Sequence, residues 1–146
     1  MDMNKTQQKL AKYGQAVNDL IDNTEKVQEG MSKYFTPLKA AVADGKLAEM
    51  SEQDYQKTAQ IFRDGVDQYH EFLAQFKTVV APARLMGNNQ RLIGAYADFI
   101  QGCEDLITSM HDDETVDMQA FAASEMNQDK ATERISKYIQ NISRIA

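Results

Sequence analysis

Apolar residues recur at steps of three and four along most of this chain, and the repeat continues without a slip over long segments. In one such segment it runs through Tyr55, Ala59, Phe62, Val66, Tyr69, Leu73, Phe76 and Val80. This spacing places the apolar side chains on one stripe of an α-helix. No segment sustains the alternation of apolar and polar residues that marks a half-buried strand. The chain is therefore predicted to be all-α.

Four segments carry such a stripe, and each stripe is wider than the seam of a two-stranded coiled coil. A helix with about three apolar positions per heptad packs against two neighbours, which favours a bundle. We therefore expect a single-domain antiparallel four-helix bundle with up-down-up-down connectivity over residues 1–146. Its helices are predicted at about 4–35, 52–80, 83–111 and 115–145, with a short or kinked extra helix near 37–44.

Capping residues and a proline mark several of these ends. Ser51 stands where the N-cap of the second long helix is needed, three residues before Asp54. Thr36 and Pro37 suit the start of a short helix or of a kinked extension of the first helix. Gly45 is expected to end this segment.

Pro82 lies between two apolar runs and is predicted to separate the second and third long helices. The stripe resumes at Leu85, two residues out of phase with a helix that continues from Val80. Proline also lacks an amide proton and clashes with the preceding turn. The phase change and the proline agree on a break, so the Gly-Asn-Asn at 87–89 is expected inside the third helix.

The overall charge excludes some classes of partner. The chain has 22 Asp and Glu residues against 16 Lys and Arg residues, a formal net charge of −6. Nucleic-acid affinity rests on cations that neutralise phosphates, so no nucleic-acid partner is expected.

No run approaches the ~20 apolar residues of a membrane span. The polar N-terminal segment predicts a cytoplasmic protein, and a secreted or cell-surface location is the alternative if a leader has been removed.

Asn89 is a polar residue on the apolar stripe of the third helix. It either contacts a ligand through its amide or fixes the helix register by bonding across the bundle, a known use of a single asparagine at such a position. No strand precedes Gly87 and no Gly-Lys-Ser follows it, so this is not a phosphate-binding pattern. The structural role is favoured.

No group of residues indicates catalysis or a metal site. Asp67 and His70 have the acidic-x-x-His spacing of di-iron bundles, but that chemistry needs a second pair and further inward carboxylates. His111 lies in an acidic turn whose spacing does not match a calcium loop. Cys103, the single cysteine, occupies a stripe position that suits a buried, inert thiol. We predict a non-catalytic protein with no metal and no cofactor.

Small residues lie on or beside three stripes, at positions that the expected topology brings to a similar height. They are Gly65 in the second long helix, Gly102 and Cys103 in the third, and Ser124 in the fourth. Such a layer means either closely approaching backbones or a pocket. Glu125 and Gln128 stand nearby where bulky side chains are expected, which predicts an exposed groove, a partner surface or a polar packing layer.

Two functions from different classes follow. Long amphipathic helices can present a face to another helix. The first hypothesis is therefore a non-catalytic interaction protein, such as an adaptor, secretion partner, immunity protein or chaperone, with a protein partner or self-association. The alternative is a small-molecule sensor or carrier with a pocket near Gly65, Gly102 and Ser124. A metal-dependent bundle enzyme is disfavoured by the missing ligands.

Overall fold

The computed structural model describes residues 4–146, and this part of the chain is all-helical, as predicted. Its elements in chain order are α1 (Lys5–Ala43), the 3-10 turn η1 (Leu47–Glu49), α2 (Glu52–Lys77), the 3-10 turn η2 (Ala83–Leu85), α3 (Met86–Ser109) and α4 (Met118–Ile145). None of the helices in this range is long and apolar enough to cross a membrane.

Three of these α-helices begin with a side chain that accepts a hydrogen bond from the first turn. The Asn4 side chain accepts from the Gln7 amide at 2.8 Å, and the Gln7 side chain accepts from the Asn4 amide at 3.1 Å. Ser51 caps α2, as predicted, by accepting from the Asp54 amide at 3.1 Å. Asp117 caps α4 in the same way. The caps satisfy amide groups that have no partner within the helix.

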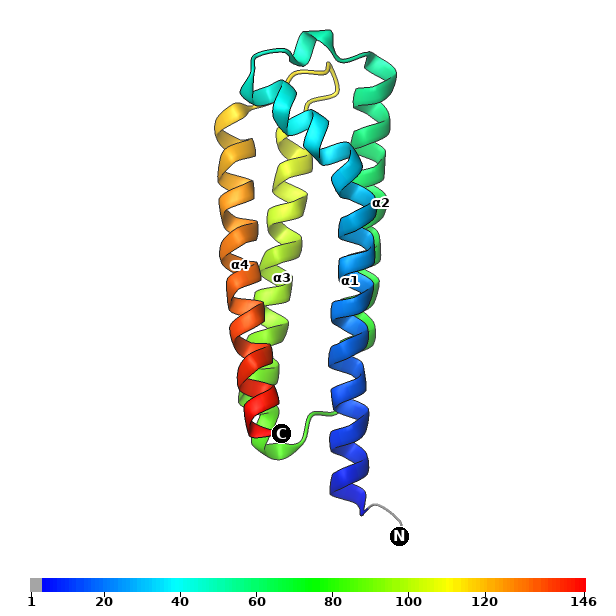
Figure 1. The fold of residues 1–146 in the computed structure, drawn as a ribbon, viewed down its shortest axis with the longest axis vertical. Helices are drawn as coiled ribbons and strands as arrows, with labels where there is room; N and C mark the ends of the chain where they lie inside the picture. Colours follow the sequence, from blue (N-terminus) through cyan, green and yellow to red (C-terminus); the bar gives the residue numbers. More distant parts are fainter. Residues whose placement is uncertain (1–3) are drawn as a thin grey trace.

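The structure corrects the expected break near residue 36. Thr36 caps no new helix and Pro37 begins none, because α1 continues through both to Ala43. The segment 37–44 is therefore the kinked extension of the first helix and not a separate element. Figure 1 shows the end of α1 leaning away from the axis of its first part, toward α4. A proline inside a helix removes one hydrogen bond and bends the helix. Gly45 follows the end of α1 in the left-handed region (φ 67°), as a helix terminator does.

Local turns shift four other predicted boundaries. α2 ends at Lys77 and not at residue 80, and α3 begins at Met86, after η2, and not at residue 83. α3 ends at Ser109 and not at residue 111, and α4 begins at residue 118 because Asp117 is its cap. The predicted break around Pro82 is confirmed, and residues 87–89 lie within α3 as expected.

The four long helices lie side by side along the long axis of the molecule (Figure 1). The connections α1–α2 and α3–α4 are at one end, and the α2–α3 connection and the C-terminus are at the other. α1 packs on α2, α2 on α3, and α3 on α4. Two apolar clusters fill the interior: a larger one around Tyr69, Tyr96 and Phe99, and one around Phe62 and Phe121 near the α3–α4 connection.

α3 and α4 come into close contact at Gly102. A Cβ atom built on Gly102 would lie 2.8 Å from Cγ of Gln128, 3.3 Å from its backbone nitrogen and 3.4 Å from the Ser124 carbonyl oxygen. Gln128 Nε2 donates to the Gly102 carbonyl oxygen at 3.2 Å, and the buried Ser124 hydroxyl donates to the Phe121 carbonyl oxygen at 2.7 Å. These small residues therefore permit close packing of two helices.

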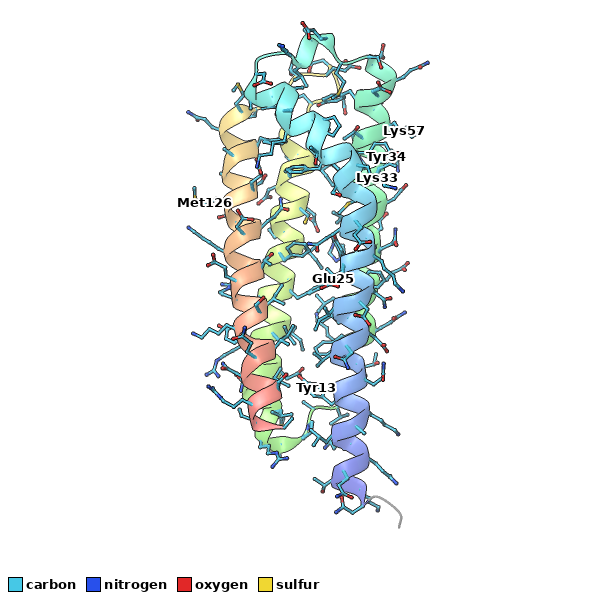
Figure 2. The ribbon with its side chains drawn as sticks, viewed as in Figure 1. Tyr13, Glu25, Lys33, Tyr34, Lys57 and Met126 are labelled. Carbon is cyan, nitrogen blue, oxygen red and sulfur yellow. The ribbon has the colours of Figure 1, made fainter. Side chains whose placement is uncertain are left out.

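Two tyrosine hydroxyls join α1 to α3. Tyr13 Oη donates to Oδ1 of Asn89 at 2.7 Å, and Figure 2 shows Tyr13 on the side of α1 that faces the other helices. Thr24 Oγ1 donates to the Leu20 carbonyl oxygen at 2.6 Å, so it accepts the proton of Tyr96 Oη, which lies 2.7 Å away. Asn89 thus meets a partner within the chain, and the two bonds set the register of α1 against α3.

Replacing Gly102 by alanine is expected to lower the free energy of unfolding by about 1–3 kcal/mol, because the added methyl group would push Gln128 and the α4 backbone away. The matched control is Gly94→Ala in the same helix, where no described atom outside the adjoining backbone of the helix and the two neighbouring residues lies within 4 Å of the built Cβ. That change should raise the free energy of unfolding by about 0.5–1 kcal/mol. Urea denaturation measures both variants. A Gly102→Ala variant as stable as the parent would contradict the close contact.

Candidate functional site

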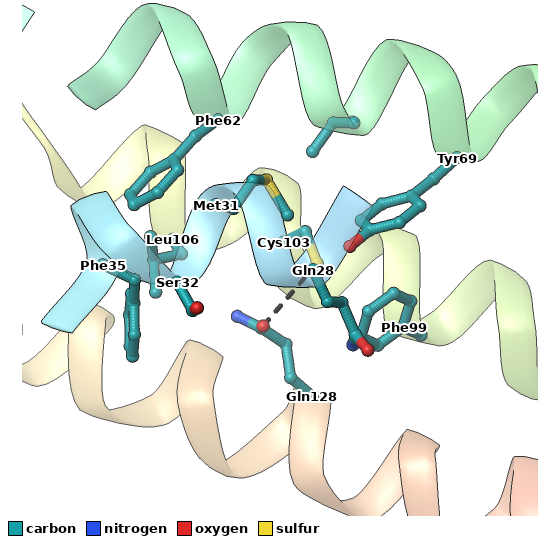
Figure 3. Close-up of a pocket in the computed structure, with 11 residues that line it drawn as sticks. Gln28, Met31, Ser32, Phe35, Phe62, Tyr69, Phe99, Cys103, Leu106 and Gln128 are labelled. Carbon is teal, nitrogen blue, oxygen red and sulfur yellow. Dashed lines mark hydrogen bonds between the residues drawn. The ribbon is translucent and has the colours of Figure 1, made fainter. Parts of the chain in front are cut away.

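A cavity of ≈ 180 Å³ lies between α1 and α4 and extends to α2 and α3 (Figure 3). Its lining residues are Gln28, Met31, Ser32 and Phe35 of α1, Phe62, Val66 and Tyr69 of α2, Phe99, Cys103 and Leu106 of α3, and Gln128 of α4. Gln28 and Ser32 are exposed, so the mouth of the cavity is at the surface. A mostly apolar cavity with a few polar groups is typical of a small-molecule site.

The course of α1 explains the cavity. Near its C-terminal end the helix reaches α4, where Phe35 stacks on Phe121 with ring centroids 6.1 Å apart. Lys39 Nζ also lies 2.8 Å from Glu125 Oε2, and this ion pair raises the pKa of the lysine. Over its first part α1 packs on α2 and stands farther from α4 than α3 does (Figure 1). The cavity lies in the space that remains between these two contacts.

The buried side chain of Tyr69 brings a polar hydroxyl group to the wall of the cavity. The residue is 0% exposed, and its oxygen has no hydrogen-bond partner among residues 4–146. Phe99 holds the ring edge-to-face at a centroid distance of 5.2 Å. Figure 3 shows the hydroxyl directed into the space near Cys103 and Gln28. An unsatisfied buried hydroxyl costs about 1–3 kcal/mol, so a molecule that bonds to it removes that cost.

Cys103 is not placed for nucleophilic catalysis. Burial raises the pKa of its thiol to about 12, and the Glu104 carboxylate adds to the rise. The thiolate is the reactive form, so the group stays protonated and inert at neutral pH. Its Sγ donates to Gln128 Oε1 at 3.6 Å (Figure 3). Cys103 therefore serves as a small wall residue of the cavity.

A second cavity of ≈ 300 Å³ continues along the space between α1 and α4, farther from the bend of α1. Its lining includes Leu20, Ile21, Thr24, Glu25, Tyr96, Thr132, Ile135, Ser136, Ile139 and Gln140. It shares Gln28 and Phe99 with the first cavity, so these two side chains form the boundary between them. The two cavities are therefore neighbours along the space between α1 and α4.

The structure divides the predicted layer of small residues into two separate contacts. Gly65 packs against Met31 of α1, whose Sδ occupies the place that a Cβ on Gly65 would need. Gly102 packs against Ser124 and Gln128 of α4. Of the residues predicted for a pocket or a partner surface, Cys103 and Gln128 line the cavity, whereas Asn89, Gly65, Gly102, Ser124 and Glu125 do not.

The two histidines take part in local structure. His70 Nε2 lies 2.7 Å from Glu104 Oε1 in an exposed pair that links α2 and α3. His111 belongs to the α3–α4 connection, where its carbonyl oxygen accepts from Tyr55 Oη at 2.9 Å. Within residues 4–146 no three His, Cys, Asp or Glu side chains converge as a metal site would require.

The acidic turn between α3 and α4 is bonded to itself and to α2. Thr115 donates both its amide and its hydroxyl to Asp113, which lowers the pKa of that carboxyl. Tyr55 Oη also bonds to the Thr115 carbonyl oxygen at 3.1 Å, and Gln56 Nε2 donates to Glu114 Oε1 at 3.1 Å. The turn is therefore a structural connection.

Sequence reasoning did not single out Tyr69, Met31 or Gln28 as site residues. Tyr69 and Phe99 belong to the predicted stripes, where core packing is the ordinary interpretation. No sequence signal marks Tyr69, because whether a buried tyrosine hydroxyl finds the partner it needs is decided only in the folded chain. The other three buried tyrosines each have one, and Tyr69 has none among the described residues.

Comparison with known proteins gave no match. No protein-family model matches the chain, and no curated protein and no solved structure is significantly similar to it.

Stability is expected to fall at high pH because several buried acids have raised pKa values. Burial raises the pKa of Tyr96 and of Cys103 to about 12, from ordinary values of 10.0 and 9.0, and also raises that of Tyr69. A group whose pKa is higher in the folded state stabilises the fold below its unfolded pKa, and this stability is lost as the pH rises toward the folded value. Thermal melts should therefore give a steady Tm up to about pH 9 and a steep decline above pH 10.

Tyr69→Phe is the matched variant for this test. It removes one raised pKa without breaking a hydrogen bond, so its Tm at pH 8 should equal or exceed that of the parent. Its decline above pH 10 should be shallower. A parent Tm that stays constant to pH 11 would contradict the buried, neutral tyrosines.

Proposed function

We propose that the chain is a non-catalytic small-molecule sensor or carrier that takes its ligand into the cavity between α1 and α4. The observation that carries this proposal is the Tyr69 hydroxyl, which has no hydrogen-bond partner among residues 4–146 and lies on the wall of a mostly apolar cavity. The proposal includes an up-down-up-down four-helix bundle, which is supported by the contacts between consecutive helices and by connections at alternating ends. It also includes a cytoplasmic location for the protein, where the thiol of Cys103, the single cysteine, would stay reduced.

The walls of the cavity define the class of ligand. A cavity of about 150 Å³ is enough to hold benzene, and this one measures ≈ 180 Å³. Phe35, Phe62 and Phe99 supply aromatic surface, and Met31 supplies a flexible side chain that adapts to shape. None of the described lining residues is charged. The ligand we infer is a small, uncharged, mostly apolar molecule with one hydrogen-bond acceptor for Tyr69.

Binding is favoured over catalysis by the chemistry of the same walls. The titratable groups that line the cavity are Tyr69 and Cys103, and burial raises the pKa of both. A general base works best with a pKa near the operating pH. The remaining polar groups are the Gln28 and Gln128 amides and the Ser32 hydroxyl. This set can orient a ligand and supplies no base.

A protein partner is the second candidate, with self-association as its simplest form. On the outer side of α4, Met118 and Met126 are 61% and 58% exposed and lie two helical turns apart, with Ala122 between them. Figure 2 shows Met126 pointing away from the other helices. Exposed methionines adapt to varied partner helices. Glu125 and Gln128 give this role less support, because Lys39 and Gly102 already engage them.

The ligand proposal is tested with two molecules of equal shape: acetophenone, which has a carbonyl acceptor, and α-methylstyrene, which has a methylene group instead. Both should shift the NMR signal of the Met31 methyl group saturably and leave that of the exposed Met126 unchanged. Acetophenone should bind about fivefold to tenfold more tightly, because its oxygen accepts from Tyr69. In Tyr69→Phe the preference should vanish while α-methylstyrene still binds.

Two results would overturn the proposal. If neither molecule moves the Met31 signal, the cavity admits only water. If acetophenone keeps its advantage in Tyr69→Phe, the hydroxyl does not select the ligand.

A further inference from the structure

The two ends of the molecule carry opposite charge. At the end that holds the α2–α3 connection and the C-terminus, residues 4–18, 72–97 and 135–146 contain no Asp or Glu. They contain eight cations, which we call the basic end: Lys5, Lys9, Lys12, Lys77, Arg84, Arg91, Lys137 and Arg144. The segments 43–56 and 110–120 at the opposite end contain eight acidic residues and a single lysine, Lys46.

The charge of the basic end is not compensated within the described chain. All eight side chains are exposed, and none forms an ion pair within residues 4–146. Although the net charge of the chain is −6, the basic end therefore carries a concentrated positive charge. A surface of this kind attracts anionic partners at a distance.

Two large apolar side chains protrude from the same end. Val80 and Met86, on either side of the Pro82 turn, are 66% and 52% exposed. A surface hollow lined by Lys5, Lys9 and Lys12 of α1 and by Thr78, Val79 and Val80 places the α1 lysines beside this turn. Single exposed apolar residues are ordinary, but these two share one end of the molecule with eight exposed cations, and Val80 lines the same hollow as Lys5, Lys9 and Lys12.

We propose that the basic end docks onto an anionic membrane surface, with Val80 and Met86 entering the lipid interface and the lysines and arginines of the basic end contacting lipid phosphates. Apolar side chains bordered by Lys and Arg are the usual composition of an interfacial anchor. Anionic lipids attract such clusters within a Debye length of the surface. The acidic end of a second copy also complements the charge, but it accounts less well for the protruding Val80 and Met86.

This docking is independent of the ligand cavity, and sedimentation with vesicles tests it. The chain should bind vesicles of phosphatidylcholine and phosphatidylserine, and not those of phosphatidylcholine alone. Binding should weaken as salt is added. Both a Val80→Ser/Met86→Ser variant and a Lys77→Glu/Arg84→Glu variant should lower the partition coefficient about tenfold or more.

Matched controls place the same changes elsewhere on the surface. Met118→Ser/Met126→Ser removes equally exposed apolar groups, and Lys33→Glu/Lys46→Glu makes the same change in net charge. Both should bind as the parent does. Equal loss in the controls, or no binding to phosphatidylserine, would overturn the proposal. So would full binding by Val80→Ser/Met86→Ser, or lipid-free self-association in sedimentation velocity that Lys77→Glu/Arg84→Glu abolishes.

Discussion

The close contact between α3 and α4 at Gly102 is the constraint that fixes one side of the cavity. Because glycine has no side chain, α4 packs so closely on α3 that a Cβ atom on Gly102 would lie 3.3 Å from the Gln128 backbone nitrogen, and the Gln128 amide bonds to both Gly102 and Cys103. α1 is fixed separately, by packing on α2 and by the two tyrosine hydroxyls that meet α1 and α3. It meets α4 at its bent end through Phe35. The cavities occupy the space between these two sets of contacts.

The helices could be predicted from the sequence because their cause is local. The three-and-four repeat, the Ser51 cap and the Pro82 break depend on neighbouring residues alone. The continuity of α1 through Pro37 could not be predicted, because it depends on tertiary contacts: Leu38 is fully buried, and Phe35 stacks on a residue far along the chain. The predicted end of α2 at residue 80 was wrong for a related reason, since the helix ends at Lys77. Val80 continues the periodic pattern but lies exposed beyond the helix, so the pattern overstated its length.

The candidate site was predictable only in part. Cys103 and Gln128 stand out in the sequence because each interrupts an apolar stripe, Cys103 with a small side chain and Gln128 with a polar one. Both line the cavity. Tyr69 has no such mark, since a tyrosine on a stripe is ordinary core. Whether its hydroxyl finds a partner is decided by where α1 and α3 lie, and that is a property of the assembled fold. Asn89 illustrates the reverse case, because it looks like a site in the sequence and in the structure bonds to Tyr13.

The proposed function depends on an accessible apolar cavity at Tyr69, between α1 and α4. Crystals of the chain exposed to xenon under pressure would reveal this cavity, because xenon enters apolar cavities of this size and scatters strongly. We expect a xenon peak between α1 and α4, in contact with Met31, Phe99 and the Tyr69 ring. The cavity would be refuted by electron density in which α1 packs against α4 at this level, Tyr69 bonds to a protein group and no xenon peak lies beside it.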